Sequence, residues 1–458
     1  MVVGQVAEGR DLVVIGGGPG GYEAALHAVT LGRTVTLVDR RGAAGLGGEC
    51  LHTGCIPSKT LIELAEHERR ASGGQPGSSV LAEFQQQKSQ VVGGLHDAVQ
   101  RLVERTGIEV VAGEARFIAG DRLAIDRPDG LPMFLEYRHV ILATGSRPIQ
   151  IGSVPFDGDR VLDSAGVLAL EVLPRSIAVV GGGYIGVELG TALAKLGVQV
   201  TIVELADQLL PGIDADISRV LAAGLERRGV RVELGATASG LTDDGIVARR
   251  GEDELQIEAD KVLVAVGRVA NTDDVGLTAT GAVLDARGLV VTDGQCRATP
   301  RIFAIGDVRE GPALAHKATA EGKMAVEVAS GIVAHRDVGH IPLIVFSDPE
   351  VASVGRTGRD VAESGGELVA GKVPLGASGR ARTMGDVDGF VRVVAERATG
   401  AVVGVQIAAP HASELIATAT VLVELGAVLD DLDGIVFAHP TLGELIAMAG
   451  HAAASASG

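Results

Sequence analysis

Two closely spaced cysteines have the clearest capacity for chemistry in this chain. Cys50 and Cys55 lie five residues apart in the segment GGECLHTGCIPSK. That spacing is not typical of a zinc site, and the sequence offers no second Cys/His pair to complete a tetrahedral ligand set. Five residues of ideal helix rise about 7.5 Å, whereas a disulfide needs its Cα atoms within about 7 Å of each other. A bridge would therefore need a distorted turn, which Gly54 and Pro57 make feasible.

The pair is better suited to redox catalysis than to structural support. A distorted bridge is more readily reduced, and a thiolate near a helix N-terminus has a lowered pKa. The apolar and charged residues from Leu61 to Arg70 predict a helix that opens at this segment. The alternative is a pair of unrelated buried thiols. Cys296 has no partner in sequence, and we expect an ordinary core or surface thiol there.

The elements that must position the pair belong to an internal repeat. Residues 12–39 and 177–204 align without a gap at an offset of 165 residues. Each copy has an apolar strand, a glycine-rich turn, a helical stretch ending at a glycine, and a second apolar strand ending in a carboxylate. The matched positions are Gly16, Gly18, Gly21, Gly32 and Asp39 in the first copy and Gly181, Gly183, Gly186, Gly197 and Glu204 in the second. The sequence therefore predicts the same βαβ unit twice.

The geometry of this unit indicates dinucleotide binding. The first glycine allows a tight turn, the second lets the backbone approach a pyrophosphate, and the third permits close packing of helix on strand. The pyrophosphate then lies at the helix N-terminus. A single fingerprint of this kind is weak evidence, but two in matching contexts favour two adenine dinucleotides. Glu204 would repel a 2′-phosphate, and no Arg or Lys occurs from Glu204 to Pro211, so NAD is favoured over NADP.

The motifs together resemble the pyridine nucleotide–disulfide oxidoreductases, and within them the dihydrolipoamide dehydrogenases, over nearly the whole chain. Besides the cysteine segment, the resemblance rests on ILATGSRP (141–148), AVGRVANT (265–272), RIFAIGDV (301–308), GPALAHKA (311–318), FSDPEVASVG (346–355) and HPTLGE (439–444). It implies an α/β fold with two Rossmann-like dinucleotide-binding domains, one for FAD and one for NAD, and a C-terminal α+β dimerisation domain.

The same resemblance implies domain boundaries. The FAD-binding domain would take residues 1–150, with a helical insert around 58–106 that contains a Gly/Ser-rich loop at 71–79. The NAD-binding domain would take 151–268, and 269–338 would complete the FAD domain. The interface domain would take 339–458, with a disordered tail at 451–458.

The resemblance also implies roles for the thiols and their neighbours. Cys50 would form a mixed disulfide with the substrate, and Cys55, nearer the flavin, would supply the thiolate that contacts it. Lys59 would lie near flavin N5 and pair with Glu188, stabilising negative charge on the reduced flavin. His52 stands between the cysteines, where many relatives carry Asn, and we treat it as a local variation, although a cation there would further depress a thiol pKa.

The C-terminal motif would supply the acid–base group. His439 would be the general base, since an imidazole suits proton transfer near neutral pH, and Glu444 would orient that imidazole. Tyr184 would either cover the nicotinamide site or serve in packing. No metal site is expected. The cofactor-contacting positions implied by the resemblance are Gly16, Gly18, Pro19, Gly20, Gly21, Asp39, Gly48, Lys59, Ala115, Thr144, Gly145, Asp307, Ala315, Gly181, Gly183, Tyr184, Ile185, Gly186, Glu204, Gly267 and Arg268.

The activity so implied is oxidation of protein-bound dihydrolipoamide by NAD⁺ in a homodimer, with His439 reaching the cysteines of the other subunit. The partner would be the lipoyl domain of a 2-oxo acid dehydrogenase acyltransferase or a glycine cleavage carrier protein. The alternative is a related NAD(P)H-dependent disulfide reductase of the mycothiol or glutathione type, or a quinone reductase. Glutathione-type reductases generally have Lys at the position of Ser58, and mycothiol disulfide reductases have Thr there. Mercuric reductases need a C-terminal cysteine pair, and an NADH:quinone flavoprotein would need no pair at all.

Composition excludes other classes of function. The 58 acidic and 40 basic residues give a net charge of -18, the wrong sign for binding nucleic acid or anionic lipid. No apolar run reaches the roughly 18 residues of a membrane span. Glu8, Arg10 and Asp11 argue against a signal peptide. Three cysteines do not make a secreted disulfide framework, so we expect a cytoplasmic protein.

Overall fold

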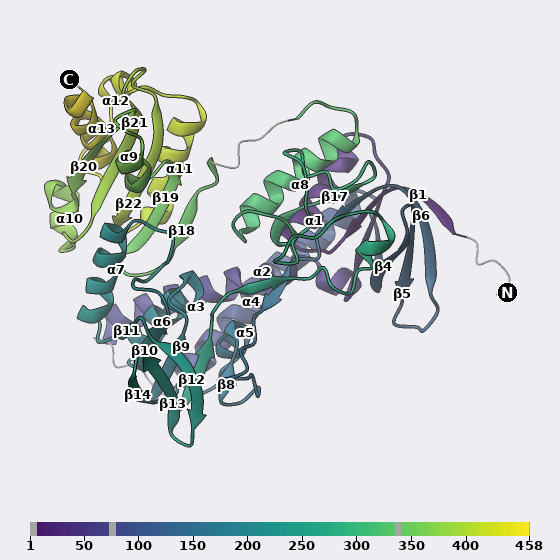
Figure 1. Cartoon of the computed structure of the whole chain (residues 1–458), viewed down its shortest axis with the longest axis horizontal. Helices are drawn as coiled ribbons and strands as arrows, with labels where there is room; N and C mark the ends of the chain where they lie inside the picture. Colours follow the sequence, from purple (N-terminus) through teal and green to yellow (C-terminus); the bar gives the residue numbers. More distant parts are fainter. Residues whose placement is uncertain (1–6, 73–78, 335–339, 458) are drawn as a thin grey trace. The chain divides into compact units, whose positions relative to one another are not determined.

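A computed structural model describes residues 7–72, 79–334 and 340–457 (Figure 1). Most of the Gly/Ser-rich loop expected at 71–79 lies outside these residues. The chain divides into two compact units, each built from several segments. The first comprises residues 1–60, 85–149 and 267–338, and the second comprises 61–84, 150–266 and 339–458.

The first unit is built on a seven-stranded sheet with the order β3-β2-β1-β6-β5-β4, in which β17 also pairs with β6. Its strands are β1 (Glu8–Ile15), β2 (Val35–Asp39), β3 (Glu109–Ala112), β4 (Glu114–Ala119), β5 (Arg122–Asp126), β6 (Met133–Leu142) and β17 (Ile302–Ala304). β3, β2, β1, β6 and β17 run parallel, and β4–β6 form an antiparallel meander. Leu12 and Val14 enter one core and Val13 and Ile15 another, so β1 is buried on both faces.

The helices of the first unit carry its glycine turn and cysteines. They are α1 (Pro19–Thr30), the short η1 (Gly42–Gly45), α2 (Gly48–His52), α3 (Cys55–Ser72), α4 (Val80–Arg105), η2 (Leu277–Ala279), η3 (Gly306–Val308) and α8 (Ala315–Ala329); α3 and α4 extend into residues of the second unit. A two-stranded ladder pairs β7 (Ser146–Pro148) with β16 (Arg268–Ala270). These strands lie at the two crossovers, where the chain leaves the first unit and where it returns to it.

The second unit repeats the parallel arrangement. Strands β11 (Arg231–Leu234), β10 (Gln199–Glu204), β9 (Ser176–Val180), β15 (Lys261–Val264) and β8 (Val161–Leu162) lie side by side in that order, with α5 (Ser164–Leu168), α6 (Tyr184–Lys195) and α7 (Ala215–Arg227). The same unit contains a separate three-stranded antiparallel sheet of β12 (Thr237–Thr242), β13 (Gly245–Arg250) and β14 (Asp253–Glu258). The predicted repeat is therefore confirmed.

The C-terminal part of the second unit is an antiparallel sheet with helices. Its order is β18 (Leu343–Val345), β19 (Glu350–Gly355), β22 (Val402–Ala409), β21 (Phe390–Glu396) and β20 (Leu368–Pro374). The helices are α9 (Gly358–Glu363), η5 (Leu375–Ala377), α10 (Gly379–Met384), α11 (Ala412–Glu424), α12 (Leu429–Gly434) and α13 (Glu444–Ser457). The predicted fold class, two dinucleotide-binding folds and a C-terminal α+β domain, is confirmed.

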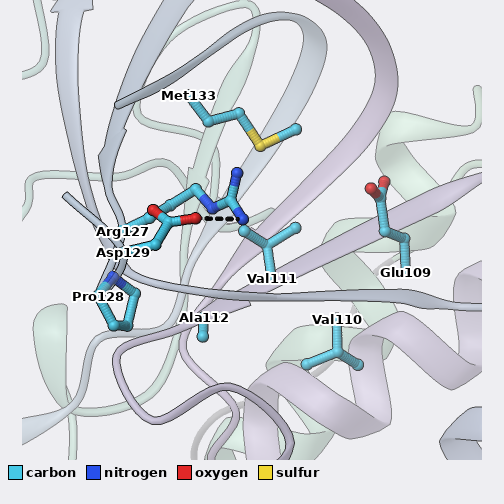
Figure 2. Close-up of a pocket in the computed structure, with 8 residues that line it drawn as sticks. All are labelled: Glu109, Val110, Val111, Ala112, Arg127, Pro128, Asp129 and Met133. Carbon is cyan, nitrogen blue, oxygen red and sulfur yellow. Dashed lines mark ion pairs between the residues drawn. The ribbon is translucent and has the colours of Figure 1, made fainter. Parts of the chain in front are cut away.

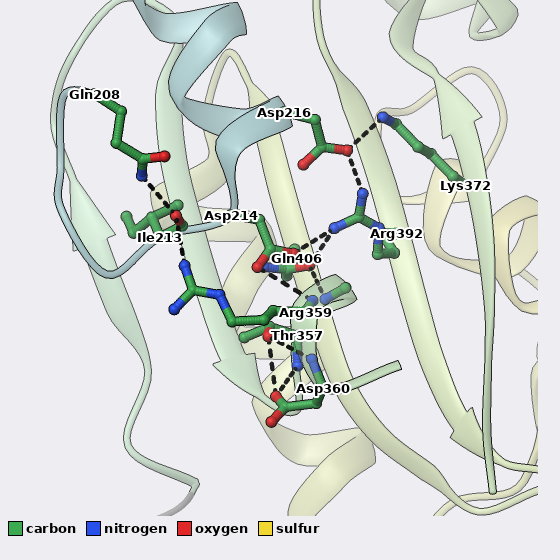
Figure 3. A network of polar contacts seen from close by, with 11 residues as sticks. Gln208, Ile213, Asp214, Asp216, Thr357, Arg359, Asp360, Lys372, Arg392 and Gln406 are labelled. Carbon is green, nitrogen blue, oxygen red and sulfur yellow. Dashed lines mark hydrogen bonds and ion pairs between the residues drawn. The ribbon is translucent and has the colours of Figure 1, made fainter. Parts of the chain in front are cut away.

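A buried polar network connects α7 to this C-terminal sheet (Figure 3). Arg392 of β21 donates to Asp214 at 2.7 Å and to Gln406 of β22 at 2.7 Å, and it pairs with Asp216. Lys372 of β20 also contacts Asp216 at 2.7 Å. Because Arg392 and Asp214 are buried, each charge depends on the other for compensation.

The expectation of a disordered tail at 451–458 was wrong, because α13 continues to Ser457. Alanine is the best helix former, and Ala449 and Ala453 are fully buried. The helix lies so close to β20 that a Cβ on Gly371 would stand 2.0 Å from the Ala449 carbonyl oxygen. None of the helices in the described residues combines the length and apolarity needed to cross a membrane.

Candidate active site

The two glycine turns have the same tight geometry. Gly16 and Gly181 have φ angles of +108° and +110°, in the region that side chains disfavour. A Cβ on Gly21 would lie 1.9 Å from the Gly16 carbonyl oxygen, and one on Gly186 would lie 2.1 Å from that of Gly181. The first and third glycines are therefore required by the fold of each turn, as the sequence predicts.

The second glycine of each turn is required by neither backbone angle nor packing. Gly18 and Gly183 are the N-caps of α1 and α6, and no side chain caps either helix. A Cβ on either would meet no atom within 4 Å. Uncapped helix N–H groups facing open space at a bare glycine fit an anionic group such as a dinucleotide pyrophosphate.

The carboxylate at the end of each second strand closes its own glycine turn. Asp39 accepts the N–H of Gly17 at 2.9 Å and that of the residue two positions after itself, also at 2.9 Å. Glu204 accepts the N–H of Gly182 at 2.6 Å and again that of the residue two positions on, at 2.7 Å. Carboxylate oxygens have further lone pairs, so both side chains can also accept a ribose hydroxyl.

The cysteine segment forms an interrupted helix. α2 ends at His52 and α3 begins at Cys55, so the distorted turn expected from the spacing is present. A Cβ on Gly54 would lie 3.1 Å from the Glu49 carbonyl oxygen, so a glycine suits this bend. The segment adjoins the first glycine turn, because a Cβ on Gly48 would lie 2.6 Å from the Gly18 Cα.

The two thiols are hydrogen-bonded to each other. Both are free thiols, and Cys55 is the more exposed. The hydrogen bond to Cys55, together with burial, raises the pKa of the Cys50 thiol, while the charge of Lys59 opposes that shift. The two sulfurs are therefore close enough to interact directly, as a redox pair requires.

His52 does not supply a cation to the thiols. Its Nε2 lies 2.9 Å from the carbonyl oxygen of Leu46, and its ring lies 5.2 Å from that of His96. Burial lowers the pKa of His52 below its ordinary value, which disfavours a charged imidazole beside the thiols. We therefore do not expect His52 to lower the pKa of either thiol.

Several of the expected cofactor positions meet at the two crossovers. Asn271 donates its backbone N–H to the Gly145 carbonyl at 2.9 Å, and the Thr144 hydroxyl donates to the Asn271 carbonyl at 2.7 Å. Gly267 accepts the backbone N–H of Ile149 at 3.0 Å. Ala115 lies in β4, and Ala315 begins α8. Their contacts with cofactor stay predictions.

Two further expectations concern the second unit. Glu188 of α6 is buried, and its carboxylate accepts the backbone N–H of Phe346 at 3.0 Å. Its pairing with Lys59 stays a prediction. Tyr184 begins α6 and is partly buried against the core of this unit. This contact supports the packing role, and its place over the nicotinamide stays a prediction.

His439 and Glu444 lie together at the start of α13. The imidazole Nδ1 is 2.9 Å from a carboxylate oxygen of Glu444, and the other oxygen accepts the backbone N–H of Thr441 at 2.8 Å. These two hydrogen bonds, that of Thr441 first, hold the pKa of Glu444 below its ordinary value. The His439 side chain is 78% exposed, so the imidazole is held by its carboxylate yet open to a reactant.

A cavity of about 450 Å³ lies at the edge of the first sheet (Figure 2). Its walls come from β3, from the loop between β5 and β6 and from the first residue of β6: Glu109, Val110, Val111, Ala112, Arg127, Pro128, Asp129 and Met133. Ala112 pairs with Asp39 across β3 and β2, so the cavity begins beside a strand end of the kind where parallel sheets bind ligands. No motif marks these residues. The one available signal was that neighbouring parallel strands end at the same sheet edge.

Comparisons agree with this geometry. A family model described as pyridine nucleotide-disulphide oxidoreductase matches residues 10–322, and the dimerisation domain of that family matches 341–449. Dihydrolipoyl dehydrogenase of Geobacillus stearothermophilus is 41% identical, and that of Halobacterium salinarum is 43% identical, each over 97% of this chain and 96% of the relative.

Solved structures give the same result. The crystal structure of LpdA from Mycobacterium tuberculosis superposes with a TM-score of 0.89 at 30% identity, covering 96% of this chain and 99% of that one. The HOCl-induced flavoprotein disulfide reductase RclA from Escherichia coli gives a TM-score of 0.84 at 27% identity, with the same coverage. The chain belongs to the pyridine nucleotide-disulphide oxidoreductase family, whose members use FAD and NAD.

Proposed function

We propose that this chain is a dihydrolipoyl dehydrogenase. It oxidises protein-bound dihydrolipoamide to lipoamide and reduces NAD⁺ to NADH, releasing one proton. The observation that carries the proposal is the hydrogen-bonded Cys50–Cys55 pair, set on an interrupted helix that adjoins the first glycine turn. The names of the relatives that match almost the whole chain support the choice of substrate.

The two glycine turns would each hold one dinucleotide. The first unit, with Gly18, Asp39 and Asp307, would bind FAD, and residues 150–266 of the second, with Gly183 and Glu204, would bind NAD. FAD, when bound, supplies a two-electron carrier between thiols and nicotinamide. The absence of Arg and Lys from Glu204 to Pro211 supports NAD over NADP.

The thiol chemistry would divide between named side chains. His439, oriented by Glu444, takes the proton of a substrate thiol. That thiolate attacks the Cys50 sulfur of the oxidised pair, which forms a mixed disulfide and breaks the Cys50–Cys55 bond. The second substrate thiol then displaces Cys50, so the substrate leaves as a disulfide with two fewer hydrogens and both cysteines are left reduced. Lys59, paired with Glu188, would balance negative charge on the reduced cofactor.

The dimerisation domain supports a homodimer in which His439 serves the cysteines of the other subunit. The lipoyl group would arrive on the acyltransferase of a 2-oxo acid dehydrogenase complex or on a glycine cleavage carrier protein. We propose that the enzyme acts in the cytoplasm, in keeping with its small number of cysteines.

A substrate panel tests the proposal. Steady-state rates with dihydrolipoamide and NAD⁺ are compared with rates for glutathione disulfide, mycothiol disulfide and a quinone, each with NADH or NADPH. We expect the highest kcat/KM for dihydrolipoamide with NAD⁺, and loss of that activity in Cys50→Ser and His439→Gln variants that keep their FAD. A higher kcat/KM for another acceptor, or near-normal turnover in either variant, would overturn it.

A further inference from the structure

A continuous array of polar contacts within the first unit connects the cysteine segment to Asp307. Arg268 forms an ion pair with Glu49, the residue before Cys50. Its Nε donates to the Ser146 hydroxyl at 2.7 Å, and another of its nitrogens donates to the Ser146 carbonyl at 2.8 Å. The same hydroxyl donates to an Asp307 carboxylate oxygen at 2.6 Å. One guanidinium therefore joins three segments that lie far apart in sequence.

Burial makes this array sensitive to the loss of a member. The Arg268 side chain is 14% exposed and Ser146 is 9% exposed, so their polar atoms would be costly to leave without partners, whereas Glu49 is 40% exposed and its carboxylate reaches solvent. The neighbouring residue provides a contrast. Arg147 pairs with Asp273 at 2.6 Å, but these side chains are 47% and 54% exposed. Such a surface pair contributes little.

The Asp307 end of the array is held in place by buried charged side chains that bind the backbone of the preceding residue. Gly306 donates its N–H to Glu321 at 2.7 Å and accepts from Lys317 Nζ at 2.9 Å, and both side chains are buried. Arg309 completes the pairing of Glu321. The turn η3 cannot shift without breaking these bonds. The turn is therefore the fixed end of the array, and Ser146 and Arg268 connect it to Glu49.

We propose that Arg268 is a positioning residue that sets the contact between the redox thiols and the flavin. It acts through Glu49, whose backbone continues into Cys50, and through Ser146, which orients the Asp307 carboxylate. This inference rests on the proposed function, in which Asp307 is a ligand of the flavin. A guanidinium suits the task because its rigid planar fork directs separate nitrogens to Ser146 and Glu49 in fixed directions, whereas an ammonium group on a flexible stem fixes neither direction.

The test uses the FAD-loaded protein and a chemical dithiol. Wild type and variants are titrated anaerobically with dithiothreitol, and the long-wavelength absorbance of a thiolate beside flavin is recorded across a range of pH. The variants are Arg268→Met, Arg268→Lys, Ser146→Ala and Glu49→Gln, with Arg147→Met as the matched control. The FAD content of each variant is measured first.

We expect Arg268→Met to lower the amplitude of this band at least twofold and to change its pH profile, with Arg268→Lys giving little rescue. Ser146→Ala should act in the same direction, and Arg147→Met should match wild type. The effects of Glu49→Gln and Arg268→Met should be less than additive. If Arg268→Met does not retain FAD, Ser146→Ala decides the matter.

A wild-type band in Arg268→Met and in Ser146→Ala would overturn the proposal, as would an equal change in Arg147→Met. The titration uses dithiothreitol and does not depend on the biological substrate. Failure of the wild type to turn over dihydrolipoamide would therefore refute the proposed function, while the effect of Arg268 on the absorbance band could still be measured.

Discussion

The two glycine turns have nearly the same geometry but different continuations. In each turn, the glycine that lies between the first and second fingerprint glycines accepts a backbone N–H from a residue later in the chain. The Gly17 carbonyl accepts from Gly47 at 2.8 Å, and the Gly182 carbonyl accepts from Leu210 at 2.9 Å. In the first copy the chain then runs into the cysteine segment. In the second copy it runs through buried leucines to Asp214, which belongs to the polar network around Arg392.

This difference separates nucleotide binding from chemistry. The turn, its carboxylate and its helix N-terminus are shared, so they account for holding a dinucleotide and nothing more. Redox capacity comes from the segment attached to the first turn, where Gly47 and Gly48 lead into Cys50. At the corresponding place the second turn leads into a structural ion pair. The comparison predicts that each turn can be damaged with a distinct consequence.

The largest effect should come from filling the third glycine of each turn. Gly21→Val would force side-chain atoms into the Gly16 carbonyl, and overpacking of this kind costs about 1–3 kcal/mol or more. We expect this variant to lose most of its FAD. Gly186→Val should keep FAD and dithiol reduction but lose the reaction with NAD⁺. The FAD-to-protein absorbance ratio and the rate of NADH formation measure the two losses, and loss of FAD in both variants would contradict the separation.

The network after the second turn should matter for stability alone. Arg392→Met leaves Asp214 without its buried partner, which is expected to lower the free energy of unfolding by about 3–5 kcal/mol. Denaturant unfolding measures this, with Arg227→Met as a control because its pair with Asp388 is exposed. Dithiol reduction of the folded variant should be normal. Equal stability of the two variants would refute a structural role for the network.

Smaller, reciprocal effects should follow from the two carboxylates. Glu204→Gln weakens charge-assisted hydrogen bonds worth about 1.5–3 kcal/mol, so we expect a roughly tenfold to hundredfold higher KM for NAD⁺ with normal FAD content. Asp39→Asn should weaken FAD binding and leave the KM for NAD⁺ unchanged. Steady-state kinetics and FAD release on dilution measure the two. A change in both cofactors from either substitution would argue against independent sites.

The smallest effect concerns acid stability. Burial raises the pKa of Asp216, but Lys372 and Arg392 outweigh burial and hold this pKa below its ordinary value of 3.8. The stabilisation is therefore complete above that value and is lost as the pH falls through the lower folded-state pKa. We expect Asp216→Asn to flatten the fall in unfolding free energy below about pH 4, by on the order of 1 kcal/mol. Denaturant unfolding between neutral pH and acid checks this, with Asp388→Asn as the exposed control. Parallel pH profiles would be the contrary result.

Local pattern was enough to predict much of this molecule. The repeat at 165 residues predicted both parallel sheets and the steric roles of Gly16 and Gly21, because these depend on residues close in sequence. The bend between Cys50 and Cys55 followed from spacing. The contact of Arg268 with Glu49 joins residues 219 apart, and no periodicity marks it. The charge of His52 was not predictable for a similar reason, since burial by the surrounding fold lowers its pKa.

A single-turnover experiment decides whether the Cys50–Cys55 pair passes electrons from dihydrolipoamide to FAD. The FAD-loaded protein is mixed anaerobically with dihydrolipoamide, and flavin absorbance is followed before and after NAD⁺ is added. We expect rapid reduction of the flavin by dihydrolipoamide in the wild type, then NADH formation on adding NAD⁺, and no reduction in Cys50→Ser or Cys55→Ser. Wild-type flavin that stays oxidised, or a serine variant that reduces at the wild-type rate, would contradict this expectation.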